Sequence, residues 1–151
     1  MADPAGKRYT GAGIDVFYEA QRCLHFAECV RGLPEVFDPS QRPWIRADNA
    51  EAERLAEVIR RCPSGALHYA SEAVAPERPD QPTSVEPVPD GPLNLRGDLA
   101  LQTPAGELRE TRASLCRCGL TANQPFCDHE CERSGWRSGV TTPESAPGEP
   151  R

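Results

Sequence analysis

Seven cysteines, arranged in two groups, are the residues of this sequence best suited to chemistry. The later group follows the spacing C-x-C-x8-C-x3-C and consists of Cys116, Cys118, Cys127 and Cys131. Two cysteines separated by one residue cannot reach across a fold to different partners, so their thiolates point at one place. The earlier group consists of Cys23, Cys29 and Cys62. An odd total divided in this way is typical of metal ligands rather than of disulfide pairs. We interpret each group as a metal or iron–sulfur site.

The residues between the later cysteines favour iron–sulfur over zinc. The spacing alone also permits tetrahedral zinc, although structural zinc sites more often pair their ligands as C-x2-C or C-x4-C. The stretch reads Cys116-Arg-Cys118-Gly-Leu-Thr121-Ala-Asn-Gln-Pro125-Phe-Cys127-Asp128. It resembles the CDGSH (NEET) iron–sulfur family, whose signature is C-x-C-x2-(S/T)-x3-P-x-C-D-G-(S/T)-H. The resemblance implies a small β-rich domain that holds a 2Fe-2S cluster.

One departure from that signature concerns the fourth ligand. Where the family has Gly-Ser-His after Cys-Asp, this chain has His129-Glu130-Cys131, so Cys131 takes the position of the family's histidine ligand. We expect Cys131 to be the fourth ligand, with His129 as the alternative. Histidine ligation raises the reduction potential of a cluster, so a thiolate here predicts a lower potential. It also removes the one ligand that titrates near neutral pH.

The earlier group keeps the outline of a single-cluster bacterial ferredoxin, C-x2-C-x2-C followed by C-P. Its segments are Cys23-Leu-His25-Phe26-Ala-Glu-Cys29 and Cys62-Pro63, with Phe26 where the middle cysteine would be. The chain from about Arg8 to Ala70 is similar to the divergent mono-cluster ferredoxins. Three thiolates suit a 3Fe-4S cluster, and the alternative is a 4Fe-4S cluster whose fourth iron is held by His25, by solvent or by a small ligand. His25 could instead pack over the site or donate a hydrogen bond to cluster sulfur.

The elements expected to position the first site have an α+β order. Residues 13–18 alternate apolar and polar side chains, which predicts a short strand. Asp48, with Glu51 three residues on, predicts the start of a helix whose apolar stripe continues until Pro63 ends it. Residues 67–69 predict a short closing strand.

Prolines and a second alternating pattern divide the rest of the chain. Six prolines fall within residues 73–92, which predicts a semi-rigid linker without helix or central strand. Alternating leucines, a turn at 103–106 and a returning segment at 107–115 predict a hairpin. The expected organisation is α+β throughout: a ferredoxin-like domain at 8–72, the linker at 73–92, a CDGSH-type domain at 93–140 and a disordered tail at 141–151.

The composition supports two small metal-stapled units. The 151 residues include 16 prolines and are 38% hydrophobic, which is poor material for one large core. No stretch approaches the ~20 apolar residues of a membrane span, and the first residues lack an apolar run of signal length. We therefore expect a cytoplasmic protein whose thiols stay reduced. A net charge of −6 argues against a nucleic-acid surface and suits a carrier that docks on a basic patch of its partner.

The function expected from these features is one-electron transfer between proteins, without enzymatic catalysis. The two clusters would relay electrons from a reductase to an oxygenase or another reductive enzyme. The alternatives are cluster transfer or redox sensing, because CDGSH proteins are associated with cluster transfer, and a zinc-stapled interaction module. Single-motif CDGSH proteins are commonly homodimers with exchanged strands, so a homodimer is also among the expectations.

Overall fold

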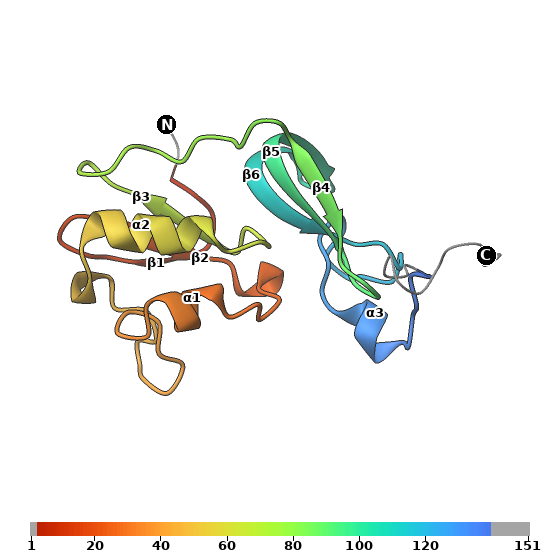
Figure 1. The fold of residues 1–151 in the computed structure, drawn as a ribbon, viewed down its shortest axis with the longest axis horizontal. Coiled ribbons are helices and arrows are strands. Elements are labelled where there is room, and N and C mark those ends of the chain that lie inside the picture. The colour runs from red at the N-terminus through yellow and green to blue at the C-terminus, as the bar shows by residue number, and fades with distance from the viewer. Residues whose placement is uncertain (1–2, 140–151) are drawn as a thin grey trace, which may run out of the picture. The chain divides into compact units, whose positions relative to one another are not determined.

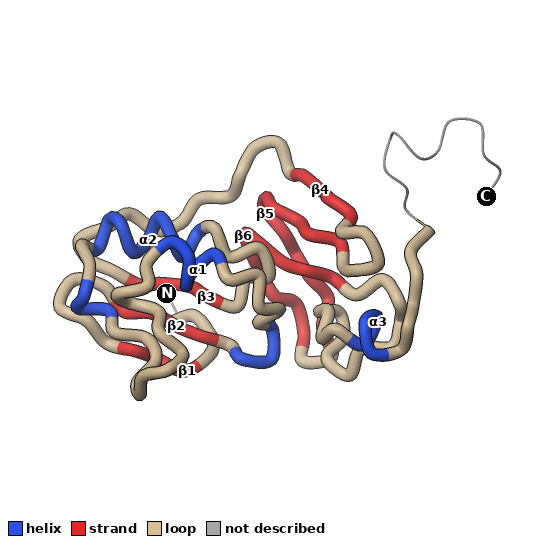
Figure 2. The backbone as a smooth tube through the Cα atoms, turned by 60° about the horizontal axis from the view of Figure 1, so that its bottom comes forward, coloured by secondary structure: helices blue, strands red, loops and turns tan. Residues whose placement is uncertain are grey.

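The chain folds as two compact units, one up to Pro79 and one from Asp80 onward. The computed structural model describes residues 3–139. Each unit combines one antiparallel three-stranded sheet with helical structure, so the α+β class is confirmed (Figures 1 and 2). The predicted tail at 141–151 lies outside the described residues.

The first unit is built on the sheet order β1-β2-β3. Its strands are β1 (Lys7–Tyr9), β2 (Asp15–Tyr18) and β3 (Leu67–Ala70). Its helices are α1 (Glu28–Gly32) and α2 (Ala52–Arg60), with 3-10 turns η1 (Ala20–Arg22) and η2 (Ala47–Asn49). The strands at β2 and β3 confirm the prediction, whereas β1 and α1 were not predicted, because each is too short to show a period.

Helix α2 supplies much of the core of this unit. It turns Leu55, Ala56, Val58 and Ile59 inward, and it packs against β3 (Figure 1). The predicted start of the helix is wrong, because Glu51 occupies the N-cap position and Asp48 lies before it in η2. The carboxylate of Asp48 instead accepts the backbone N–H of Ala12 at 2.7 Å, a contact with a distant loop that local spacing cannot reveal.

The second unit is dominated by a long hairpin. Its strands are β4 (Ser84–Pro87), β5 (Leu93–Thr103) and β6 (Gly106–Leu115) in the order β4-β5-β6, and its helix is α3 (Glu130–Arg133). The predicted turn is confirmed, since Thr103 pairs with Gly106 at the end of the hairpin (Figure 2). Leu99 and Leu101 of β5, Ala113 of β6 and Phe126 of the loop that follows form a small apolar cluster.

Strand β4 lies within residues 73–92, where the prolines predicted a linker without helix or central strand; it is an edge strand, so part of that stretch belongs to the second sheet instead of forming a linker. It pairs with β5 at the edge of the sheet, where a proline need not interrupt a ladder on both sides. Gly97, at φ +151°, sits beside a bulge in β5, and a Cβ there would come within 2.3 Å of the Thr83 hydroxyl oxygen. Only glycine therefore lets the segment leading into β4 approach so closely. None of the helices within residues 3–139 has the length and apolar character that crossing a bilayer requires.

Two candidate metal centres

The later cysteines lie on a loop that hydrogen bonds close at its base. Strand β6 ends at Leu115, and the N–H of Cys116 donates to the carbonyl of Pro125 at 2.9 Å. The N–H of Cys127 donates to the carbonyl of Ser114 at 3.0 Å. These two bonds place Cys116 and Cys127 side by side, although eleven positions separate them in the sequence.

Thr121 holds the interior of this loop. Its buried hydroxyl donates to the carbonyl of Phe126 at 2.7 Å and accepts the N–H of Asn123 at 3.1 Å. Asp128 accepts the N–H groups of Ala122 and Glu130 at 3.0 and 3.1 Å. Burial opposes ionisation of Asp128, but these hydrogen bonds outweigh it and lower the pKa of its carboxyl. The threonine and aspartate of the motif therefore shape the loop and leave the cysteine sulfurs for a metal.

The sulfurs of Cys116 and Cys118 lie 3.8 Å apart. Two thiolates on one tetrahedral metal with a metal–sulfur distance of about 2.3 Å are about 3.8 Å apart, so the pair fits one metal ion without rearrangement. Thiolate donor sets of this kind suit zinc or iron–sulfur clusters rather than magnesium or calcium.

Backbone N–H groups point at three of the sulfurs. Gly119 donates to Cys116 at 3.2 Å, and Leu120 donates to Cys118 at 3.4 Å. His129 donates its backbone N–H to Cys127 at 3.4 Å. Burial opposes the Cys116 thiolate, but the surrounding N–H donors outweigh it and lower the pKa of this thiol. Such donors stabilise negative charge on sulfur, as a thiolate-ligated cluster requires.

Cys131 joins this group, whereas the side chain of His129 turns toward Glu132. Cys131 is buried in α3, with 3% of its surface exposed. Burial raises the pKa of Cys118, and the charges of Cys116 and Cys131 add to this shift. Burial and the neighbouring Cys131 raise the pKa of Cys127 to about 11. His129 Nδ1 lies 3.7 Å from the Glu132 carboxylate. The structure thus brings together the four cysteines and points the imidazole at a carboxylate.

Arg117 lies between two of these cysteines, yet its side chain binds other segments. Its Nε donates to the carbonyl of Gly91 at 2.9 Å and its Nη2 to the carbonyl of Val88 at 2.6 Å. Its guanidinium lies over the ring of Trp136, 5.3 Å from the ring centre. We call these four residues the Arg117 clamp. It ties the metal loop to the turn after β4 and to the chain beyond α3, and no local pattern predicts it.

The N-terminal cysteines converge from three separate elements of the first unit. Cys23 follows η1, Cys29 lies in α1 and Cys62 follows α2. Together with His25 they line one small cavity, whose other polar side chains include Tyr18 and Ser64. Burial, followed by the charges of Cys62 and Cys23, raises the pKa of Cys29 to about 11. Bare thiolates are therefore unfavourable here, and a bound metal would compensate their charge.

Hydroxyl groups accompany two of these sulfurs. Tyr18 hydrogen-bonds Cys23, and burial together with this bond raises the pKa of the tyrosine. Ser64 Oγ lies 3.4 Å from the sulfur of Cys62. Sequence analysis missed both roles. The role of Ser64 could have been predicted from its position two residues after Cys62, since Ser and Thr side chains often form local hydrogen bonds in turns. No sequence pattern predicts the role of Tyr18.

The Cys23 end of this site opens onto a surface groove of about 600 Å³. Tyr9 and Trp44 line it, and Lys7 and Arg42 add positive charge. Trp44 is held edge-on against Tyr18 at 4.9 Å between ring centres.

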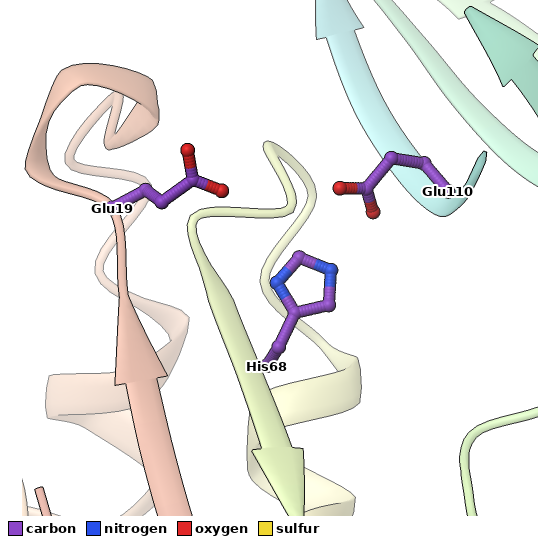
Figure 3. Close-up of side chains that lie close together, drawn as sticks. All are labelled: Glu19, His68 and Glu110. Carbon is purple, nitrogen blue, oxygen red and sulfur yellow. The ribbon is translucent and has the colours of Figure 1, made fainter. Parts of the chain in front are cut away.

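Another histidine, His68, lies on β3 and projects to the same side as Glu19, which follows β2 (Figure 3). The third side chain in that view, Glu110, belongs to β6 of the second unit. Neither His68 nor Glu19 is among the residues that line the cysteine cavity within the part of the chain described.

Comparison with known proteins identifies both regions. The family described as divergent 4Fe-4S mono-cluster matches residues 9–72, and the family described as iron-binding zinc finger, CDGSH type, matches residues 90–130. Uncharacterized protein YjdI of Escherichia coli K12 is 39% identical over 69 residues, which cover 46% of this chain and 91% of YjdI. YjdI of Escherichia coli O157:H7 matches to the same extent. No solved structure matches the chain.

These matches agree with the two cysteine sites, each of which has the donors that an iron–sulfur cluster requires. The chain therefore belongs to the divergent 4Fe-4S mono-cluster family and carries a CDGSH-type iron-binding domain after it.

Proposed function

We propose that this iron–sulfur protein is a cytoplasmic electron carrier that takes single electrons from a reductase and delivers them to an oxygenase or another reductive enzyme. The observation that carries the proposal is the use of every cysteine. All seven are unpaired thiols, and each lies in one of the two sites. Two centres in one chain suit a relay.

The proposed cofactors are a 2Fe-2S cluster in the second unit and a 3Fe-4S or 4Fe-4S cluster in the first. Bound clusters supply one-electron valence changes of iron. The protein residues determine how easily these occur. In the second unit the N–H donors of Gly119, Leu120 and His129 favour the more negative state of the sulfurs. Ligation by the Cys131 thiolate opposes reduction, because it adds negative charge to the centre. The reduction potential therefore depends on the balance between the N–H donors and this added charge.

The groove beside the first centre supports docking of a redox partner. Its aromatic and basic residues lie next to Cys23 and Cys29, so a partner seated there would approach the ligands directly. Lys7 and Arg42 favour an acidic patch at this point, although the whole chain carries −6. The net charge predicts a basic patch on the partner, and such a patch would bind the acidic surface of this protein outside the groove.

Cluster transfer is the second candidate, and the outer end of the CDGSH loop favours it. Leu120 is 54% exposed, and it follows Cys118 by two residues. An acceptor protein could reach this edge of the loop. Incubation with an apo-ferredoxin distinguishes the two functions: a carrier retains its iron and leaves the acceptor without a cluster, whereas a transfer protein loses its second-unit cluster to the acceptor within minutes.

The decisive experiment is anaerobic purification with quantification of iron, sulfide and zinc, followed by electron counting. The dithionite-reduced protein, freed of excess dithionite, should reduce about two equivalents of cytochrome c, one for each cluster. Cys62→Ala and Cys127→Ala should each lower this to about one equivalent, because each removes a ligand of a different centre. Stoichiometric zinc without sulfide would overturn the proposal.

A further inference from the structure

We propose that His25 is the fourth protein ligand of the N-terminal centre, which is thereby a 4Fe-4S cluster held by three thiolates and one imidazole. This inference rests on the proposed iron–sulfur function of the first unit. It assigns a ligand that neither the family match nor the spacing of the cysteines identifies.

The first argument is the composition of the cavity. A 4Fe-4S cluster needs one terminal ligand for each of its irons, and Cys23, Cys29 and Cys62 supply three. His25 lines the same cavity as these cysteines, and its Nδ1 lies 4.0 Å from the sulfur of Cys23. Imidazole nitrogen replaces thiolate on iron in other iron–sulfur centres, so the chemistry of the side chain fits the place.

The second argument concerns the other polar side chains around the cavity, which already have partners. Tyr18 bonds Cys23. Ser64 Oγ lies against Cys62 and accepts the N–H of Ala66 at 3.2 Å. The carboxylate of Glu28 accepts a hydrogen bond from Arg31 at 2.9 Å. His25 therefore remains as the lining side chain best placed to act as a ligand.

The third argument is the backbone of the loop. His25 has φ +57° and Ala27 has φ +65°, a left-handed conformation that residues with a side chain seldom adopt. Leu24, between Cys23 and His25, is buried with 4% of its surface exposed. The turn at His25 returns its side chain to the side of Cys23 while Leu24 enters the protein. Strained positions of this kind cluster at binding sites, where the surrounding structure maintains them.

The contact with Cys23 also indicates which nitrogen binds iron. A metal-bound histidine usually donates its second ring N–H to a neighbouring acceptor, which fixes the tautomer. Nδ1 faces the Cys23 sulfur, so we assign Nδ1 as the N–H donor to that thiolate and Nε2 as the ligand. His25 also lines the outer groove, so the imidazole occupies the boundary between the metal site and the surface.

The first test is spectroscopic. The full-length protein is produced with ¹⁵N-labelled histidine, and the reduced clusters are examined by pulsed electron paramagnetic resonance. A nitrogen coupling is expected in the signal of the N-terminal cluster. It should persist in His68→Ala and His129→Ala, which are matched histidine controls from the two units, and it should vanish in His25→Ala and His25→Cys.

Iron content gives a second readout. Wild type should hold about six irons per chain, and His25→Ala should hold about five and show the paramagnetic signal of an oxidised 3Fe-4S cluster. His25→Cys should restore the iron, since a thiolate replaces the imidazole. A wild type with sulfide and two clusters but without histidine nitrogen coupling would refute the ligand assignment and leave the carrier function intact. A wild type without sulfide would refute the carrier function itself.

Discussion

Substitution of Arg117 by alanine should release the metal loop of the second unit. The change removes the hydrogen bonds to Gly91 and Val88 and the contact with Trp136. At this partly buried site each hydrogen bond contributes about 1 kcal/mol. The cation–π contact adds about 0.5–1 kcal/mol. The sum, about 3 kcal/mol, corresponds to an opening of the loop about 100-fold more frequent.

The assay is the rate of cluster loss in the presence of an iron chelator, followed by visible absorbance under anaerobic conditions. The Cys62→Ala background removes the absorbance of the N-terminal centre, so that the second-unit cluster is observed alone. Arg117→Lys should lose its cluster at an intermediate rate, because an ammonium keeps the charge but cannot form both bonds. Arg109→Ala is the matched control, since Arg109 is 63% exposed and pairs with Asp98 on the surface of the same hairpin. Such pairs contribute little.

The reasoning fails if Arg117→Ala and Arg109→Ala release iron at the same rate. A second contrary result concerns Trp136. If Arg117→Ala accelerates cluster loss but Trp136→Ala leaves the rate at the wild-type value, the residues of the Arg117 clamp do not act as a unit.

Three further predictions concern individual cysteines. Cys131→His should keep the second-unit cluster and raise its reduction potential by something on the order of 100 mV or more, because histidine-ligated clusters have higher potentials. The potential should also depend on pH between about 6 and 8, where imidazole titrates, and protein-film voltammetry measures both effects. An intact visible spectrum in Cys131→Ser together with a bleached spectrum in His129→Ala would instead assign His129 as the ligand. In the apo-protein at about pH 7.5, iodoacetamide should modify Cys116 before Cys29, because the pKa of Cys116 is lowered and that of Cys29 is raised to about 11, so that less of Cys29 is thiolate. Peptide mapping by mass spectrometry gives the order. The raised pKa of Cys29 also means that its contribution to the stability of the folded apo-protein is complete below about pH 9 and is lost as the pH rises toward 11, which denaturation midpoints would show.

The cysteine sites were the most predictable part of this protein, because covalent spacing alone forces Cys116 and Cys118 to one place. Helix α2 and the β5–β6 hairpin were predictable for a related reason: a repeating apolar pattern or a turn signal lies within one short stretch of sequence. The pairing of these parts with distant segments was not predictable.

Three features show what local patterns miss. Asp48 has the residue type and position of a helix cap, yet it binds the backbone of Ala12. Arg117 lies between two ligands, yet it binds carbonyl groups more than twenty residues away. The place of His25 depends on a left-handed backbone, which is uncommon for residues other than glycine and which no pattern in this stretch predicts. In each case the partner lies far along the chain, or the tertiary structure overrides a local preference.

The prolines around β4 have a further consequence for the behaviour of the protein at high concentration. An edge strand presents N–H and C=O groups on which a second chain can add a strand, the first step of aggregation. Pro87 ends β4 without an N–H group, and Pro82 and Pro89 lie close on either side. Glu86 adds a charge beside Val85, which is 56% exposed. This border of the second sheet is therefore a poor template for another strand, which protects an exposed apolar side chain from intermolecular β-pairing.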